Sequence, residues 1–111
     1  MQLVSFYSGL SRCISAFGSR FSLTPLVRSD HMHVVCMYLD AGDQIGRHPA
    51  TSSQLFIVVH GAGWVEGGDG TRVAIASGHA VLWQQGEEHA AGSDEGMVAI
   101  VVESDDIGGI E

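Results

Sequence analysis

The sequence predicts an all-β fold, either a sandwich or a barrel of short antiparallel strands. Apolar segments rich in β-branched and aromatic residues are short and closely spaced, as in LFIVV and MVAIVV. Turn sequences such as DAGD, GGDG and ASGH separate these segments, and the chain contains 15 glycines. No helical periodicity lies between them, which favours a sandwich or a barrel over alternating strands and helices.

The elements follow in order from these breaks. The GGDG stretch between WVE and TRVAI predicts a hairpin loop, and HGAG is expected to separate two strands. The segment SGLSRCISAF fits either a short helix or an irregular arm. We therefore expect an arm over 1–19, one barrel over 20–104 and a flexible tail over 105–111. The expected strands are Arg20–Pro25, His31–Leu39, Gln44–His48, Gln54–His60, Gly63–Glu66, Thr71–Ile75, Ala80–Trp83, Glu88–Ala91 and Met97–Glu103.

Composition limits the classes of function. The chain has 111 residues, 45% of them hydrophobic, which fits one domain with one core. All five basic residues are arginine, so Schiff-base chemistry on lysine and a Walker-type phosphate loop are excluded. The net charge of -8 argues against binding to nucleic acid or to an anionic membrane surface.

Cysteine usage and hydropathy indicate a cytoplasmic protein. Two cysteines, Cys13 and Cys36, are too few for a disulfide framework. The chain shows no signal-peptide pattern, and its apolar runs are far shorter than the ~20 residues of a membrane span.

Two groups of glycines and histidines stand at regular spacing. In the first, His48 follows Gly42 after five residues, and Gly61 follows Gln54 after six. The second group begins 16 residues later and is Gly78, Gly86 and His89.

These groups resemble the two motifs of the cupin superfamily over residues 31–103. The family's second histidine and its glutamate fall on Ala50 and Gln54, and its proline and asparagine in the second motif fall on Gln84 and Ser93. The resemblance implies a double-stranded β-helix, or jelly-roll barrel, that holds Fe, Mn, Ni, Cu or Zn inside. It also implies that His89 reaches the cavity from another strand than His48.

Strand parity supports a shared site, because residues two apart face the same side. If residues 51–53 form a turn between two paired strands, His48 lies opposite Phe56 and faces the same side as Gln54. We therefore expect His48, Gln54 and His89 to be metal ligands, with water or another side chain completing the shell. The alternative is a cavity without metal that binds an organic molecule through the same groups.

Other titratable residues are weaker candidates. The strand before the first motif offers three further ligands: His31, His33 and Cys36. His33 and Cys36 have opposite parity, so only one of them can face inward. His60 lies about 20 Å along the strand from Gln54 and cannot bind the same ion. His60, His79, Glu87 and Glu88 are expected to be exposed.

The rest of the cavity is expected to be apolar. The predicted lining residues are Phe56, Val58, Cys36 and Trp83, with Met37 as the alternative to Cys36 and Met97 or Val98 as further candidates.

Two classes of small-molecule function remain open, beside a third reading as a structural interaction domain that dimerises through sheet faces or exchanged edge strands. One is a metal-dependent dioxygenase, isomerase or lyase acting on a small organic molecule. The other is a binding or sensing module without catalysis. No catalytic residue is assigned, and there is no G-x-S-x-G nucleophile motif. The expected partners are a small organic molecule and a second copy of the chain, which would form a homodimer through residues 20–39.

Overall fold

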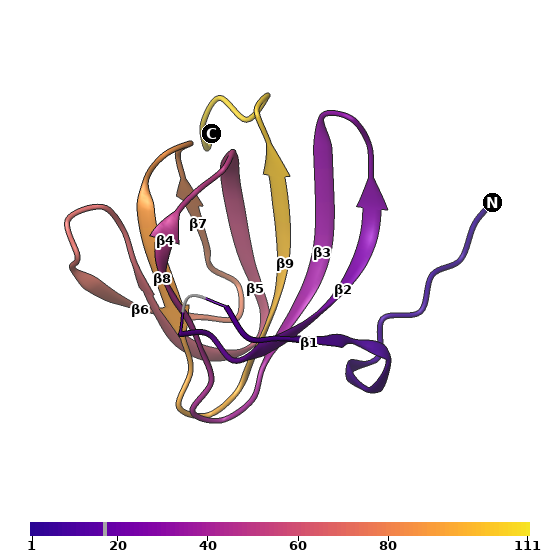
Figure 1. Cartoon of the computed structure of the whole chain (residues 1–111), viewed down its shortest axis with the longest axis horizontal. Coiled ribbons are helices and arrows are strands. Elements are labelled where there is room, and N and C mark those ends of the chain that lie inside the picture. Colours follow the sequence, from indigo (N-terminus) through magenta and orange to yellow (C-terminus); the bar gives the residue numbers. More distant parts are fainter. Residues whose placement is uncertain (17) are drawn as a thin grey trace.

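A computed structural model describes residues 1–16 and 18–111 and shows the predicted all-β fold (Figure 1). In this part of the chain the one helical element is a 3₁₀ turn, η1. The elements are η1 (Ser8–Leu10), β1 (Arg12–Ile14), β2 (Phe21–Arg28), β3 (Met32–Leu39), β4 (Gln44–Pro49), β5 (Ser53–Glu66), β6 (Arg72–Ala76), β7 (Ala80–Trp83), β8 (Glu88–Gly92) and β9 (Met97–Ser104).

The strands form one antiparallel sheet that curls into a jelly-roll barrel. Its order is β1-β2-β3-β9-β5-β8-β4, and β6 and β7 both pair with β5. The sheet curves until β4 and β8 lie across the interior from β9 and β3 (Figure 1). Neighbouring strands are therefore often distant in sequence, as are β3 and β9.

The ambiguous first segment forms neither a regular helix nor a wholly irregular arm. It contains η1, and the three residues of β1 pair with β2. The residues before η1 extend away from the barrel (Figure 1).

β5 runs unbroken through HGAG, so the expected strand break there is wrong. Its register shifts between Val58 and His60, and Gly61 has a φ of 79°, which bends the strand. A Cβ at Gly61 would lie 2.2 Å from the carbonyl oxygen of Gly96. Glycine at this position lets one strand pair with β9 and β7 along its first part and with β6 and β8 beyond the bend.

The expected pairing of β4 with β5 is also wrong. β4 pairs with β8, and residues 50–52 carry the chain across to β5 in the opposite wall. Ala50 anchors this loop, since its N–H donates to Glu87 and its carbonyl oxygen accepts from Gly86. His48 consequently lies opposite His89 instead of Phe56.

The hairpin predicted at GGDG is confirmed. β5 and β6 pair from Ala62–Ala76 to Glu66–Arg72, and Gly70 turns the loop with a φ of 77°.

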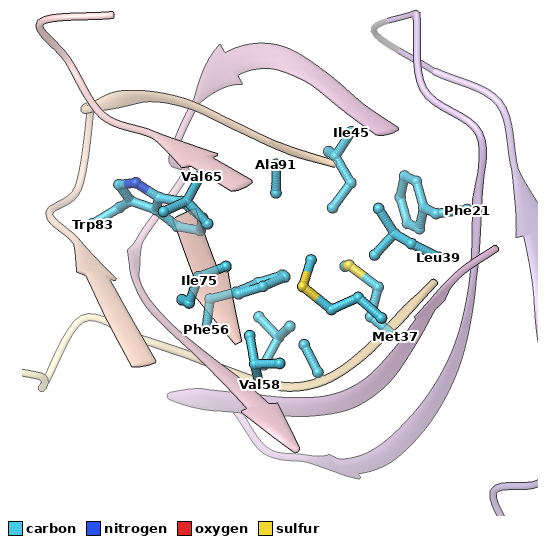
Figure 2. Packing of buried hydrophobic residues seen from close by; sticks show 13 residues of the cluster. Phe21, Met37, Leu39, Ile45, Phe56, Val58, Val65, Ile75, Trp83 and Ala91 are labelled. Carbon is cyan, nitrogen blue, oxygen red and sulfur yellow. The ribbon is translucent and has the colours of Figure 1, made fainter. Parts of the chain in front are cut away.

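The barrel interior is filled by alternating side chains of the strands (Figure 2). Phe56, Val58 and Met97 are almost completely buried, and Met37 and Leu39 reach them from β3. The core cluster is Phe21, Met37, Leu39, Ile45, Phe56, Val58, Val65, Ile75, Trp83, Ala91, Met97, Ala99 and Val101. This cluster is large enough to hold the strands that carry the site.

No helix in the described residues is long and apolar enough to cross a membrane.

Replacing Gly63 with alanine should destabilise the barrel, because a Cβ there would lie 2.1 Å from the carbonyl oxygen of Gly92. We expect the free energy of unfolding to fall by about 1–3 kcal/mol, as at other overpacked positions. Urea denaturation measures the change. Gly108→Ala is the matched control, since a Cβ at Gly108 meets nothing within 4 Å. Equal stability of the two variants would contradict this close contact between β5 and β8.

Candidate functional site

Two histidines face each other on neighbouring strands of the barrel wall. His48 on β4 pairs directly with His89 on β8. Their ring centroids are 4.4 Å apart, with the planes tilted by 53°. His48 is half-buried and His89 is buried. The strand pairing therefore brings together the two histidines that the sequence places 41 residues apart.

Each ring is oriented by the backbone carbonyl two residues before it in the chain. Nδ1 of His48 lies 2.7 Å from the carbonyl oxygen of Gly46, and Nδ1 of His89 lies 3.1 Å from that of Glu87. A carbonyl only accepts, so each Nδ1 carries the proton and donates it. In the neutral ring, Nε2 then carries the lone pair. This arrangement is typical of metal-binding histidines, whose other nitrogen is usually held by a carbonyl or carboxylate.

His89 is additionally held by its surroundings. Its ring packs on Trp83 with centroids 4.5 Å apart and planes 32° from parallel. Burial lowers the pKa of His89 below its ordinary value, and the neighbouring charge of His48 acts in the same direction. The carbonyl and carboxylate of Glu87 and the carboxylate of Glu88 oppose this shift without reversing it. The neutral ring is the form that binds a metal ion.

Gln54 enters the same cavity from the opposite wall. It lies on β5 and is buried, and its register partners are Trp83 on β7 and Glu103 on β9. The cavity has a volume of ≈ 270 Å³. Its lining is Ile14, Phe21, Leu23, His33, Val35, Met37, Ile45, His48, Gln54, Phe56, Trp83, His89, Ala91 and Glu103.

The structure thus places the three predicted ligands, His48, Gln54 and His89, around one cavity. Of the predicted apolar lining, Phe56 and Trp83 face this cavity, and both project into the barrel in Figure 2.

Val58 and Cys36 lie elsewhere. Val58 points inward but is deeper, within the core cluster. Cys36 is buried on the outer side of β3, because its neighbours Val35 and Met37 face the cavity and parity turns Cys36 away.

The remaining candidates are also placed by strand parity. His33 lines the cavity, whereas His31 lies at the rim beyond the start of β3. Ala50, at the position of the family's second histidine, is buried in the loop after β4 and is not part of the lining. His60, His79 and Glu88 are exposed as expected, whereas Glu87 is half-buried because its carboxylate accepts from the N–H groups of Gly68 and Gln84.

Sequence reasoning missed Glu103. This half-buried residue lines the cavity and is the register partner of both Gln54 and His33. The signal was the alternation in β9, where Met97 and Val101 face inward and Glu103 continues the same row. Among the described lining residues, Glu103 is the one carboxylate and none is arginine.

The described residues contain no group of three or more histidine, cysteine, aspartate or glutamate side chains arranged to hold a metal. Gln54, as an amide, falls outside that set of side chains. A metal at this site would therefore be held by two imidazoles and an amide oxygen, with its other positions open.

A second hollow of ≈ 630 Å³ lies between β6 and β7. It is larger and more open than the histidine cavity, and Val73, His79 and Glu87 are among its lining residues. It contains neither His48 nor His89. We assign the candidate site to the smaller cavity because several polar groups converge there on an apolar surround.

Comparisons with known proteins support the fold. No family model matches the sequence, and no curated protein matches it. A predicted oxalate decarboxylase from Thermotoga maritima matches with a TM-score of 0.79 and 17% identity, over 91% of this chain and 98% of the other. An RmlC-like cupin from Shewanella frigidimarina matches with a TM-score of 0.75 and 20% identity, over 92% of this chain and 90% of the other. KdgF from Halomonas sp. matches with a TM-score of 0.71 and 22% identity, over 78% of this chain and 82% of the other.

At these identities the likeness shows the fold alone. The chain has the fold of a small cupin domain, as the glycine and histidine spacing predicts.

The lowered pKa of His89 predicts a pH-dependent stability of the metal-free protein. Below the ordinary histidine pKa of about 6.5, the unfolded chain takes up a proton that the folded chain resists. The contribution of neutral His89 to stability is therefore fully present above this pH, and it is lost as the pH falls below it. Urea midpoints at pH 7.5 and 5.5, measured with chelator present, test this for wild type and His89→Gln.

We expect the loss of stability between the two pH values to be smaller in His89→Gln. The exposed His60 gives the control His60→Gln, which should retain the wild-type loss. An unchanged loss in His89→Gln would contradict the assignment to this buried ring.

Proposed function

We propose that this protein binds a divalent transition metal through His48, His89 and Gln54 and takes a small organic molecule beside it. The observation that carries the proposal is the pair of imidazoles whose Nδ1 atoms both donate to backbone carbonyls. That pairing selects the tautomer with its lone pair on Nε2, which is the atom used for ligation. The amide oxygen of Gln54 is a weaker third donor from the opposite wall.

The chain's own residues prepare the site for such chemistry. Trp83 fixes the ring plane of His89, and Phe56 provides an apolar floor that keeps water from part of the cavity. When bound, the metal would polarise a carbonyl or carboxylate of the organic molecule as a Lewis acid. Three protein donors leave positions open for that molecule or for water.

Among a dioxygenase, an isomerase and a lyase, we favour a lyase. Two similar structures are of proteins named for lyase reactions: the predicted oxalate decarboxylase of Thermotoga maritima and DMSP lyase DddQ of Ruegeria pomeroyi. This chain spans 60% of the latter, with a TM-score of 0.75 and 18% identity. The likeness itself shows the fold, so these names are a reason to test a lyase first and identify no substrate for this chain.

Calorimetric titration of protein carrying no polyhistidine tag with Zn²⁺, Ni²⁺ and Mn²⁺ tests the metal site. We expect one ion per chain, and His48→Ala or His89→Ala should lose affinity beyond the ~10–100-fold typical of removing a supporting residue. His60→Ala is the control, since His60 is exposed and outside the cavity.

Wild-type protein that binds none of these ions would overturn the metal proposal and favour the second candidate, a binding module without metal. The largely apolar lining of the cavity supports that candidate. Under it, a thermal-shift screen of small organic molecules finds a stabiliser whose effect is insensitive to chelator.

We also propose that the chain forms a homodimer through the outer face of β3, β9 and β5, which shares β3 with the interface predicted over residues 20–39 but has β9 and β5 in place of β2. The partly exposed side chains that point outward from these strands include no charged group across the centre of the face: Val34, Tyr38, Leu55, Ile57, Val98, Ile100 and Val102. A sheet apolar on both sides is typical of one that is covered. The N-terminal residues offer further unpacked apolar side chains: Leu3, Phe6, Tyr7 and Leu10. In a dimer, the outer sheet face and the N-terminal apolar residues of each copy could both be covered by the other copy.

Sedimentation equilibrium tests the dimer, with an expected mass twice that of one chain. Ile57→Lys, at the centre of the face opposite Ile100, should shift the protein to monomer. Val73→Lys is the control, because Val73 is exposed on β6 and outside this face. A monomeric wild type, or a dimer unaffected by Ile57→Lys, would contradict this interface.

A further inference from the structure

The cavity contains one carboxylate that the metal site as described does not use. Glu103 lies near the end of β9 and projects to the same side as its register partner Gln54. It also lines a third hollow, of ≈ 330 Å³, together with His48 and Gln54. Glu103 therefore faces the space between the two walls where the three donors meet.

The negative charge of Glu103 would matter to a metal ion bound in this cavity. The three donors are neutral, so a divalent ion entering the cavity would bring two positive charges that its ligands do not balance. Removing such an ion from bulk water is unfavourable unless the site supplies opposing charge or strong dipoles. Arginine is absent from the described lining, and Glu103 is the one carboxylate there, so among the residues that line the cavity it is the one whose charge can oppose that of the ion.

Register places Glu103 close enough to act but one strand further away than Gln54. The inward row across four strands reads His33, Glu103, Gln54 and Trp83, and the Trp83 end of this row packs on His89. Directly paired residues on antiparallel strands have Cβ atoms about 4.5–5.5 Å apart. Glu103 lies one strand further from the imidazoles than Gln54. Its carboxylate is therefore better placed to bind a water molecule on the metal than to bind the metal itself.

We propose that Glu103 binds the metal ion indirectly, by accepting a hydrogen bond from a water ligand, and supplies the negative charge that the three neutral donors lack. The inference rests on the proposed metal site and adds its charge-balancing group. Glu103 is thus a positioning residue for the water that shares the metal with the organic molecule.

The test is calorimetric titration with Zn²⁺ and Ni²⁺ of four tag-free proteins: wild type, Glu103→Gln, Glu88→Gln and the double variant Gln54→Glu/Glu103→Gln. We expect Glu103→Gln to bind about 10–100-fold more weakly, as for other residues that act on a metal through its ligands. Glu88→Gln removes the same charge from an exposed site beside His89 and should stay within about twofold of wild type. Thermal melting of the metal-free proteins checks that each variant is folded.

The double variant distinguishes charge from packing. It returns a carboxylate to the same row, one strand closer to the imidazoles, so binding should recover to at least the wild-type level. Wild-type affinity in Glu103→Gln, or a folded double variant that remains as weak as Glu103→Gln, would overturn the role of Glu103. A wild type that binds no metal would instead overturn the proposed function, so the two failures are distinguishable.

Discussion

One long strand, β5, forms part of both walls of the barrel, and the geometry of the site depends on its bend. Beyond the bend, β5 pairs with β8, which carries His89, and before it β5 carries Gln54 and Phe56 toward the opposite side. The bend requires backbone contact at Gly61 and Gly63, where any side chain would meet a carbonyl oxygen. The distance between the imidazole pair and the facing amide is therefore set by the path of a single backbone.

The site also depends on how the imidazoles of His48 and His89 are oriented. Both Nδ1 atoms donate to backbone carbonyls two residues earlier in the chain, and the stacking of Trp83 on His89 adds a contact from β7. Around these polar groups the cavity is largely apolar, with one carboxylate on β9. A site with few polar groups in an apolar surround favours interactions that are strong because water is displaced.

Much of this architecture was predictable from local pattern. Short β-branched segments, turn sequences and the positions of His48 and His89 indicate the fold and bring the ligand candidates to one cavity. The pairing of β4 with β8 was not predictable by proximity in sequence, because a three-residue loop crosses between walls instead of closing a hairpin. The unbroken β5 was missed because a glycine-rich stretch is as typical of a bulged strand as of a turn. Glu103 was missed because a charged residue at a strand end is usually solvated.

The hydrogen bonds of the two imidazoles have a consequence for how this cavity can change over evolutionary time. Each ring is held by the backbone carbonyl two residues before it, and neither bond involves an apolar side chain of the lining. Substitutions at positions such as Phe21, Met37 or Ile45 can therefore reshape the chamber while the nitrogen atoms keep their direction. The shape of the chamber depends on apolar side chains and the direction of the imidazoles on backbone carbonyls, so the shape can change while the direction is kept.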